Sequence, residues 1–118
     1  RDMLCVFDNA AAVAALRPDF KRLAELDVFA VIATAPGDEV DFVSRFFAPR
    51  AGIDEDPVTG SAHCTLIPYW ADRLAKTALS ARQISARGGM LWCEMRGERV
   101  GIGGQVVEFS RGEITLAP

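Results

Sequence analysis

The chain has 118 residues, of which 50% are hydrophobic and 25% are charged, and its formal net charge at pH 7 is −3. This length and composition are typical of one soluble globular domain with a buried core. The acidic balance, without any Lys/Arg run beyond short pairs, argues against nucleic-acid binding. No apolar run is long enough to span a membrane and no signal peptide opens the chain, so a cytoplasmic protein is expected.

Few residues of the chain are available to bind a metal ion or to form a disulfide. The three cysteines, Cys5, Cys64 and Cys93, show no CxxC spacing, and the chain has one histidine. This pattern argues against a disulfide framework or a zinc site and suits a reducing cytoplasm. We therefore expect no metal and no cofactor.

The first part of the chain is expected to alternate strands with short helices. Residues 3–7 form an apolar run typical of a buried strand, and residues 28–35 are rich in β-branched side chains. Residues 10–16 and 20–26 are predicted to be helical, with Asp8 or Asn9 capping the first helix and Asp19 the second. Both helices are expected to cover the surface of the domain.

A hairpin is predicted next. Residues 36–38 have the composition of a turn, and residues 40–47 alternate between two faces. Phe42, Ser44 and Phe46 fall on one face, and the residues between them fall on the other. Residues 48–55 are expected to form a loop in which the acids Asp54 and Glu55 are solvated.

The most informative stretch begins at Asp56 and continues through a turn into a helix that ends near residue 76. Pro57 and Gly60 mark the turn, and Thr59, Gly60 and Ser61 are all suitable N-cap residues. The helix carries no charged side chain before Asp72, so we expect it to be buried all round. Cys64 is then expected to act as a small buried hydrophobe.

Short strands separated by tight turns are expected after this helix. They cover residues 82–87, 90–95, 99–103, 105–109 and 113–116, with turns at residues 88–89, 97–98 and 111–112. This spacing predicts an antiparallel meander. The predicted fold is α+β: a curved antiparallel sheet, a half-barrel, wrapped around one buried central helix in a single domain of residues 1–118.

The start of the central helix predicts an anion site. The first N–H groups of a helix have no partner inside it and carry the positive end of the helix dipole. Gly60, Ser61 and Ala62 have little side chain to block them, so a carboxylate or phosphate has access. An ordinary capped helix, with Ser61 in a simple capping role, fits the same residues.

Four further residues are candidates for the same site, each with a structural alternative. Asp56 is expected either to contact a polar group of the substrate or to bind its own turn. His63 either lines the mouth of the helix in its neutral form or is a hydrogen-bonded structural residue. Gly88 and Gly89 either let the backbone approach a ligand or bend a strand.

The motif from Asp56 to Cys64, preceded by residues 43–49, closely resembles the PhzF-like family, which is named for an isomerase of phenazine biosynthesis. Residues 83–89 and 103–107 fit the family as well. The resemblance covers nearly the whole chain but only the C-terminal half of the family. It implies the diaminopimelate epimerase-like fold, in which two such domains enclose a cleft at the N-termini of their central helices.

The resemblance also implies roles for individual residues. Asp56 and Ser61 match the family's aspartate and serine, which implies contact with polar groups of the substrate for Asp56. For Ser61 it implies carboxylate binding together with the amides of Gly60 and Ala62. The glutamate that serves the family as general acid/base belongs to the N-terminal half, and no residue here corresponds to it.

Two hypotheses follow. In the first, the chain is a fragment, beginning at Arg1 and not at Met, that forms the C-terminal domain of a PhzF-like isomerase in a biosynthetic process. It supplies half of a cleft that binds a small carboxylate substrate for a proton shift, and it is inactive without the N-terminal domain. In the second, it is a non-catalytic binding or self-association module, a dimer whose second copy covers the face left by the missing half.

Overall fold

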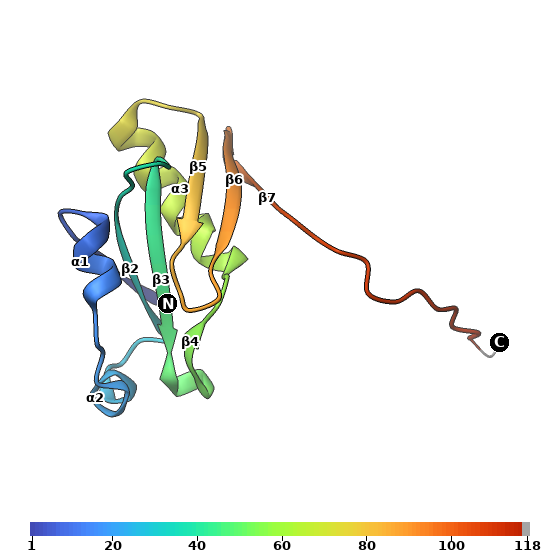
Figure 1. The fold of residues 1–118 in the computed structure, drawn as a ribbon, viewed down its shortest axis with the longest axis horizontal. Coiled ribbons are helices and arrows are strands. Elements are labelled where there is room, and N and C mark those ends of the chain that lie inside the picture. The colour runs from blue at the N-terminus through green and yellow to red at the C-terminus, as the bar shows by residue number, and fades with distance from the viewer. Residues whose placement is uncertain (117–118) are drawn as a thin grey trace.

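A seven-stranded sheet forms the frame of the domain (Figure 1). The computed structural model describes residues 1–116, so residues 117 and 118 of the predicted domain lie outside the described part. The strands are β1 (Asp2–Val6), β2 (Ala30–Pro36), β3 (Phe42–Ala48), β4 (Ile53–Asp56), β5 (Ala78–Gln83), β6 (Gly89–Arg96) and β7 (Arg99–Gly104). The helices are α1 (Ala10–Ala15), α2 (Phe20–Glu25), the 3-10 helix η1 (Pro49–Ala51) and α3 (Gly60–Leu74).

The predicted α+β class is confirmed, but the sheet is mixed. Its order is β1-β2-β3-β5-β6-β7, with β4 paired to β3 beside that path. The pairs β1·β2 and β3·β5 are parallel and the others are antiparallel. A parallel neighbour requires a long crossover, which α1 and α2 supply between β1 and β2, and β4 and α3 between β3 and β5. The expectation of an antiparallel sheet is therefore wrong for these two parallel pairs, whereas the antiparallel meander predicted after the central helix is confirmed in β5, β6 and β7.

Different helices cover the two faces of the sheet. Phe42 and Phe46 of β3 pack in the core with α3, whereas Val43 and Phe47 pack with Val13 of α1 in a second cluster. The predicted alternation of β3 is thus confirmed. The predicted caps are confirmed too, because the side chain of Asn9 caps α1 and that of Asp19 caps α2. No helix among residues 1–116 has the length and apolar character needed to cross a membrane.

The helix α3 is buried on one face only. Its buried residues recur at helical spacing and are Ala62, His63, Leu66, Ile67, Trp70 and Ala71. Trp70 stacks on Phe42 at 5.8 Å between ring centroids, and its indole N–H donates to Thr34 Oγ1 at 3.0 Å. Cys64 is exposed. The expectation of a helix buried all round, with Cys64 in the core, is wrong because the sheet packs against α3 from one side.

Two segments differ from the sequence-based expectation, and one predicted turn is confirmed. Residues 48–55 contain η1 and the start of β4 instead of a plain loop. The strand β5 begins at Ala78, ahead of the predicted 82–87, because Leu79 and Ala81 alternate into the core beside α3. Residues 97–98 form the predicted turn between β6 and β7, with Gly97 at φ +62°.

The predicted strands at residues 105–109 and 113–116 are absent. This tail leaves the end of β7 and runs away from the body of the domain (Figure 1). Its apolar side chains Val106, Val107, Phe109, Ile114 and Leu116 are between 84% and 100% exposed. The prediction is wrong because β7 already pairs with β6, and no other strand of residues 1–116 lies beside the tail to pair with it.

Candidate functional site

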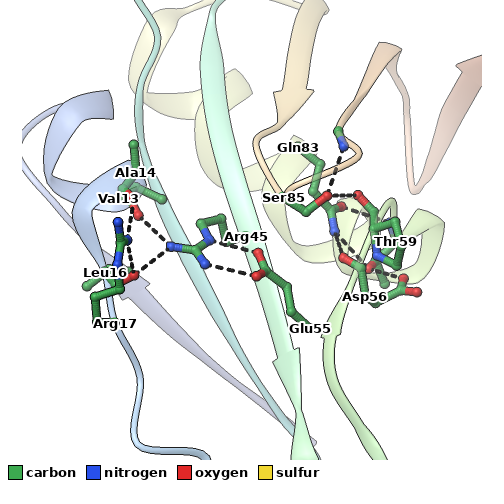
Figure 2. Close-up of polar contacts among 12 residues, drawn as sticks. Val13, Ala14, Leu16, Arg17, Arg45, Glu55, Asp56, Thr59, Gln83 and Ser85 are labelled. Atoms are coloured by element: carbon green, nitrogen blue, oxygen red, sulfur yellow. Dashed lines mark hydrogen bonds and ion pairs between the residues drawn. The ribbon is translucent and has the colours of Figure 1, made fainter.

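The site forms where two strands end against the same edge of β3. β5 pairs with β3 as far as Gln83, which lies opposite Ser44, and β4 pairs with β3 as far as Asp56, which lies opposite Phe46. The two strands approach from opposite directions, so their final residues meet beside the middle of β3. The turn from Asp56 into α3 begins at this meeting point (Figure 2).

Gln83 holds this turn in place. Its side chain is fully buried, and its Nε2 donates to the carbonyl of Asp56 at 2.7 Å and to Thr59 Oγ1 at 3.1 Å. The backbone N–H of Thr59 donates to Gln83 Oε1 at 2.8 Å. One amide side chain therefore pairs with backbone groups at both ends of the turn that leads from β4 into α3. Sequence reasoning missed this residue, although a polar side chain at an inward-facing position of the correctly placed β5 would have identified it.

Asp56 binds within its own turn. Its carboxylate accepts a hydrogen bond from the Thr59 hydroxyl, which is the kind of local contact that the structural alternative predicts. Thr59 is the N-cap of α3, but because its hydroxyl is turned to Asp56, no side chain caps the helix. The backbone N–H groups at the start of α3 thus lack a side-chain acceptor and keep the positive end of the helix dipole available.

The turn before β6 is tied to the same segment. Ser85 Oγ donates to the carbonyl of Pro57 at 2.7 Å and accepts from the backbone N–H of Gly88 at 3.0 Å. Gly88 has φ +68°, which favours glycine. A Cβ on Gly89 would lie 2.5 Å from Val58 Cγ2, so only glycine fits there. Gly88 is therefore favoured by its backbone conformation, and Gly89 by the close approach of Val58.

A cavity of about 450 Å³ lies between these turns and the end of β7. It brings together three of the predicted site residues, Gly60, Gly88 and Gly89. Its lining also contains Val58, Arg87, Met90, Leu91, Ile102, Gly103, Gly104 and Gln105. Ser61 is exposed and Ala62 is buried, and neither lines this cavity. A larger hollow of about 600 Å³ beside Asp41 and Trp92 contains none of the predicted site residues and no helix N-terminus.

His63 is a buried residue beneath the helix start and does not line the cavity. Its side chain has no exposed surface, its Nδ1 lies 2.8 Å from the carbonyl of Thr59, and its ring packs on Phe42 at 5.9 Å between centroids. Its Nε2 has no partner among the described atoms. Burial lowers the pKa of His63 below its usual value, opposed in part by the hydrogen bond to Thr59, so the imidazole is neutral near pH 7. A buried, hydrogen-bonded His63 corresponds to the structural alternative and not to a residue that lines the mouth of the helix.

Within the described part of the chain, neither the buried thiol of Cys93 nor a cluster of ligand side chains adds a reactive centre. Burial, reinforced by the negative charge of Asp41, raises the pKa of the Cys93 thiol to about 11. Such a thiol stays protonated and is a poor nucleophile. Among residues 1–116, no group of three or more His, Cys, Asp and Glu side chains gathers closely enough to hold a metal ion.

The chain is similar to known proteins over most of its length. The family model of phenazine biosynthesis-like proteins (PhzC-PhzF) matches residues 1–112. An uncharacterized isomerase of Pseudomonas aeruginosa is 58% identical over 115 residues, which are 98% of this chain and 44% of that protein. The mouse phenazine biosynthesis-like domain-containing protein 1 is 49% identical over 83 residues, which are 70% of this chain and 28% of that protein.

Solved structures agree with these sequence relatives. The crystal structure of a PhzF-family protein from Enterococcus faecalis superposes with a TM-score of 0.87 at 53% identity, over 96% of this chain and 44% of that one. A putative PhzC/PhzF protein from Clostridium difficile gives the same TM-score at 41% identity, over 98% of this chain and 45% of that one. The chain thus spans less than half the length of these relatives and structures.

Proposed function

Because the chain belongs to the phenazine biosynthesis-like (PhzC-PhzF) family, we propose that it is the C-terminal domain of an isomerase that acts without a metal or cofactor. The domain supplies half of a cleft that binds a small carboxylate substrate for a proton shift. The other half of the cleft comes from sequence equivalent to the part of the relatives that this chain does not match.

The observation that carries this proposal is the cavity at the uncapped start of α3. Gly60, Gly88 and Gly89 line it, and no side chain occupies the first N–H groups of the helix. Backbone donors at a helix start favour a bound carboxylate. Ser61, which is exposed next to Gly60 in the first turn of α3, adds a hydroxyl donor outside the cavity lining. Gln83 keeps the turn rigid, as electrostatic stabilisation of a developing charge requires.

The chemistry of a proton shift limits what this domain does alone. A general acid/base must lie within hydrogen-bond reach of the migrating proton. The described residues at the cavity offer no such group. Cys93 is a protonated thiol, His63 is buried away from the cavity, and the Asp56 carboxylate is engaged by Thr59. We therefore expect the acid/base to belong to the other half, and the 118-residue chain to have no turnover.

Deuterium exchange tests the proposal. The chain is examined alone and co-expressed with the segment of the P. aeruginosa relative that it does not match. The substrate is a dihydro-hydroxyanthranilate, which the resemblance to the phenazine isomerase suggests. The reaction is run in D₂O, and deuterium incorporation is followed by mass spectrometry. We expect no exchange with the chain alone and measurable exchange with both halves. Asp56→Asn in the two-half protein should lower the rate about tenfold to a hundredfold, because the proposed charge-assisted hydrogen bond from a polar group of the substrate to Asp56 Oδ1, the oxygen that Thr59 does not occupy, is lost. Asp54→Asn, on the exposed neighbour, should not.

Turnover by the isolated chain that disappears in Asp56→Ala would overturn the assignment of the acid/base to another half. Failure of exchange in a correctly assembled two-half protein would overturn the proposed reaction.

The tail supports a second candidate function, self-association. Val106, Val107 and Phe109 are at least 89% exposed on an extended segment. Contiguous exposed apolar surface of this kind tends to be covered by a partner. In the absence of the other half, a second copy of the chain would provide that cover, and the domain would act as a binding module without catalysis.

Light scattering over a concentration series tests the second candidate. We expect the mass to rise toward a dimer in the unmodified chain and to stay monomeric in a Phe109→Ser variant. A strictly monomeric mass of the unmodified chain at high concentration would contradict self-association and leave the two-half isomerase as the function.

A further inference from the structure

The cavity beside α3 contains one charged side chain. Its lining is made of five glycines (60, 88, 89, 103 and 104), the apolar residues Val58, Met90, Leu91 and Ile102, the polar Gln105, and Arg87. From this lining we propose that Arg87 recognises the carboxylate of the ligand in this cavity and so restricts it to small carboxylic acids whose ring packs on the apolar lining. The inference rests on the proposed function and deepens it by naming the residue that selects the substrate class.

Arg87 is free to take an anion. Within residues 1–116, its guanidinium makes no hydrogen bond or ion pair, whereas Arg45 is held by Glu55 and Arg96 by Glu94. An arginine offers five N–H donors in a planar fork that matches both oxygens of a carboxylate. No acidic side chain lines the cavity to compete for it.

The backbone that carries Arg87 is anchored to the start of α3. The next residue, Gly88, donates its N–H to Ser85 Oγ, and the same hydroxyl donates to the carbonyl of Pro57. The turn on which Arg87 sits is thereby tied to the turn that leads into the helix. This anchoring limits the backbone motion that otherwise weakens an exposed ion pair.

The rest of the lining determines what accompanies the carboxylate. Gly89 lies against Val58, and Met90, Leu91 and Ile102 add apolar surface from β6 and β7. Glycine backbone at both ends of the cavity lets a flat molecule approach the chain closely. A small apolar or aromatic acid satisfies both features, whereas a neutral amide of the same shape leaves the guanidinium without its ion partner.

Benzoate and its neutral isostere benzamide are suitable probes. Each is titrated into the ¹⁵N-labelled 118-residue chain, and the amide resonances of Gly88, Gly89, Gly103 and Gly104 are followed. We expect saturable shifts with benzoate and at least about tenfold weaker binding of benzamide. Arg87→Gln should weaken benzoate binding by at least about tenfold. The control Arg82→Gln removes the same charge from an exposed position of β5, outside the cavity, and should leave the affinity unchanged.

Each alternative outcome has a definite meaning. Equal benzoate affinity in Arg87→Gln and the unmodified chain, with dispersed resonances showing that both are folded, would overturn the proposal. So would equal losses in the Arg82 and Arg87 variants, or the absence of saturable shifts at the cavity glycines. Partial recovery of benzoate affinity in Arg87→Lys supports a charge-based role.

The exchange assay separates this inference from the proposed function. In the two-half protein, Arg87→Gln should raise KM for the dihydro-hydroxyanthranilate while the rate at saturation changes little. If the unmodified two-half protein shows no exchange but benzoate binding still depends on Arg87, the proposed reaction fails and the carboxylate site stands. If exchange occurs with an unchanged KM in Arg87→Gln, the reaction stands and the role of Arg87 fails.

Discussion

Two acidic residues that are neighbours in the chain, Glu55 and Asp56, enter very different environments. Because successive side chains of a strand point to opposite faces, Glu55 and Asp56 of β4 face different sides of the sheet (Figure 2). Glu55 accepts two hydrogen bonds from the guanidinium of Arg45, at 2.7 and 2.9 Å. Asp56 belongs instead to the polar cluster with Thr59 and Gln83 at the start of α3.

In the cluster formed by Arg45, Glu55 and the end of α1, the guanidinium of Arg45 has all its partners within the domain and offers no donor to a ligand. Besides Glu55, the guanidinium donates to the carbonyls of Val13 at 3.2 Å and Leu16 at 3.0 Å, which closes the end of α1 onto β3. The side chains of Arg45 and Glu55 are 11% and 20% exposed, so the expectation that Glu55 is a solvated acid is wrong. This cluster joins a helix, a central strand and β4, and all its partners belong to the domain itself.

The cluster of Asp56, Thr59 and Gln83 differs because its side chains form hydrogen bonds with one another but not with the backbone N–H groups at the start of α3. Thr59 and Gln83 are paired with each other and with Asp56, yet no side chain reaches the first N–H groups of α3. A polar cluster is therefore a candidate binding site where backbone N–H groups beside a cavity remain without an acceptor. Where every group is paired within the domain, the cluster has a structural role.

The largest effect is expected for Gln83→Leu. Leucine has a similar size but leaves the buried N–H of Thr59 and the carbonyl of Asp56 unpaired, at about 1–3 kcal/mol for each group. We expect unfolding free energy to fall by about 3 kcal/mol in urea denaturation, together with weaker benzoate binding. Gln105→Leu, on the exposed tail, is the matched control and should change stability by less than about 0.5 kcal/mol. Unchanged stability in Gln83→Leu would show that Gln83 does not hold the turn.

A smaller effect, on stability alone, is expected for Arg45→Met. The substitution leaves Glu55 without its ion partner in a partly buried position, for a loss of about 2 kcal/mol in urea denaturation. Arg50→Met serves as control, because its ion pair with Asp27 is exposed and should contribute at most about 1 kcal/mol. Benzoate affinity should be unchanged in both variants. A clear loss of benzoate binding in a folded Arg45→Met protein would contradict the distinction between the two clusters.

The smallest effect concerns pH. Burial lowers the pKa of His63 in the folded state, so the unfolded chain takes up a proton first as the pH falls below about 6.5. Stability should therefore be independent of this group above pH 7.5. It should decrease as the pH falls from 6.5 toward the folded-state pKa, by at most about 1.4 kcal/mol per pH unit.

His63 is the only histidine of the chain, which makes this test specific. Urea denaturation between pH 7.5 and 5.5 should show the decrease in the unmodified chain and a flatter profile in His63→Gln. A decrease of equal slope in His63→Gln would assign the pH dependence to other groups.

Most of the local structure could be predicted from the sequence. The alternation of β3, the caps at Asn9 and Asp19 and the turn at Gly97 all depend on residues close together in the chain, and all are confirmed. The motif from Asp56 to Cys64 led to the family that the comparisons support. The predictions that failed concern pairing: the direction of β1 and β5, the strand β4, and the tail after Gly104. Pairing depends on which distant strand is available, and local patterns do not contain that information.

The candidate site divides in the same way. The sequence alone predicted a helix start within residues 59–61 and proposed Asp56, Gly88 and Gly89 as candidates beside it, because turn chemistry and capping are local. Only the tertiary structure decided that Gln83 would join the ends of β4 and β5, that His63 would be buried beneath the helix start, and that Arg87 would face the cavity. These outcomes depend on two strands meeting at one edge of β3. Residues far apart in the chain become neighbours there, and buried polar groups must find their hydrogen-bond partners among them.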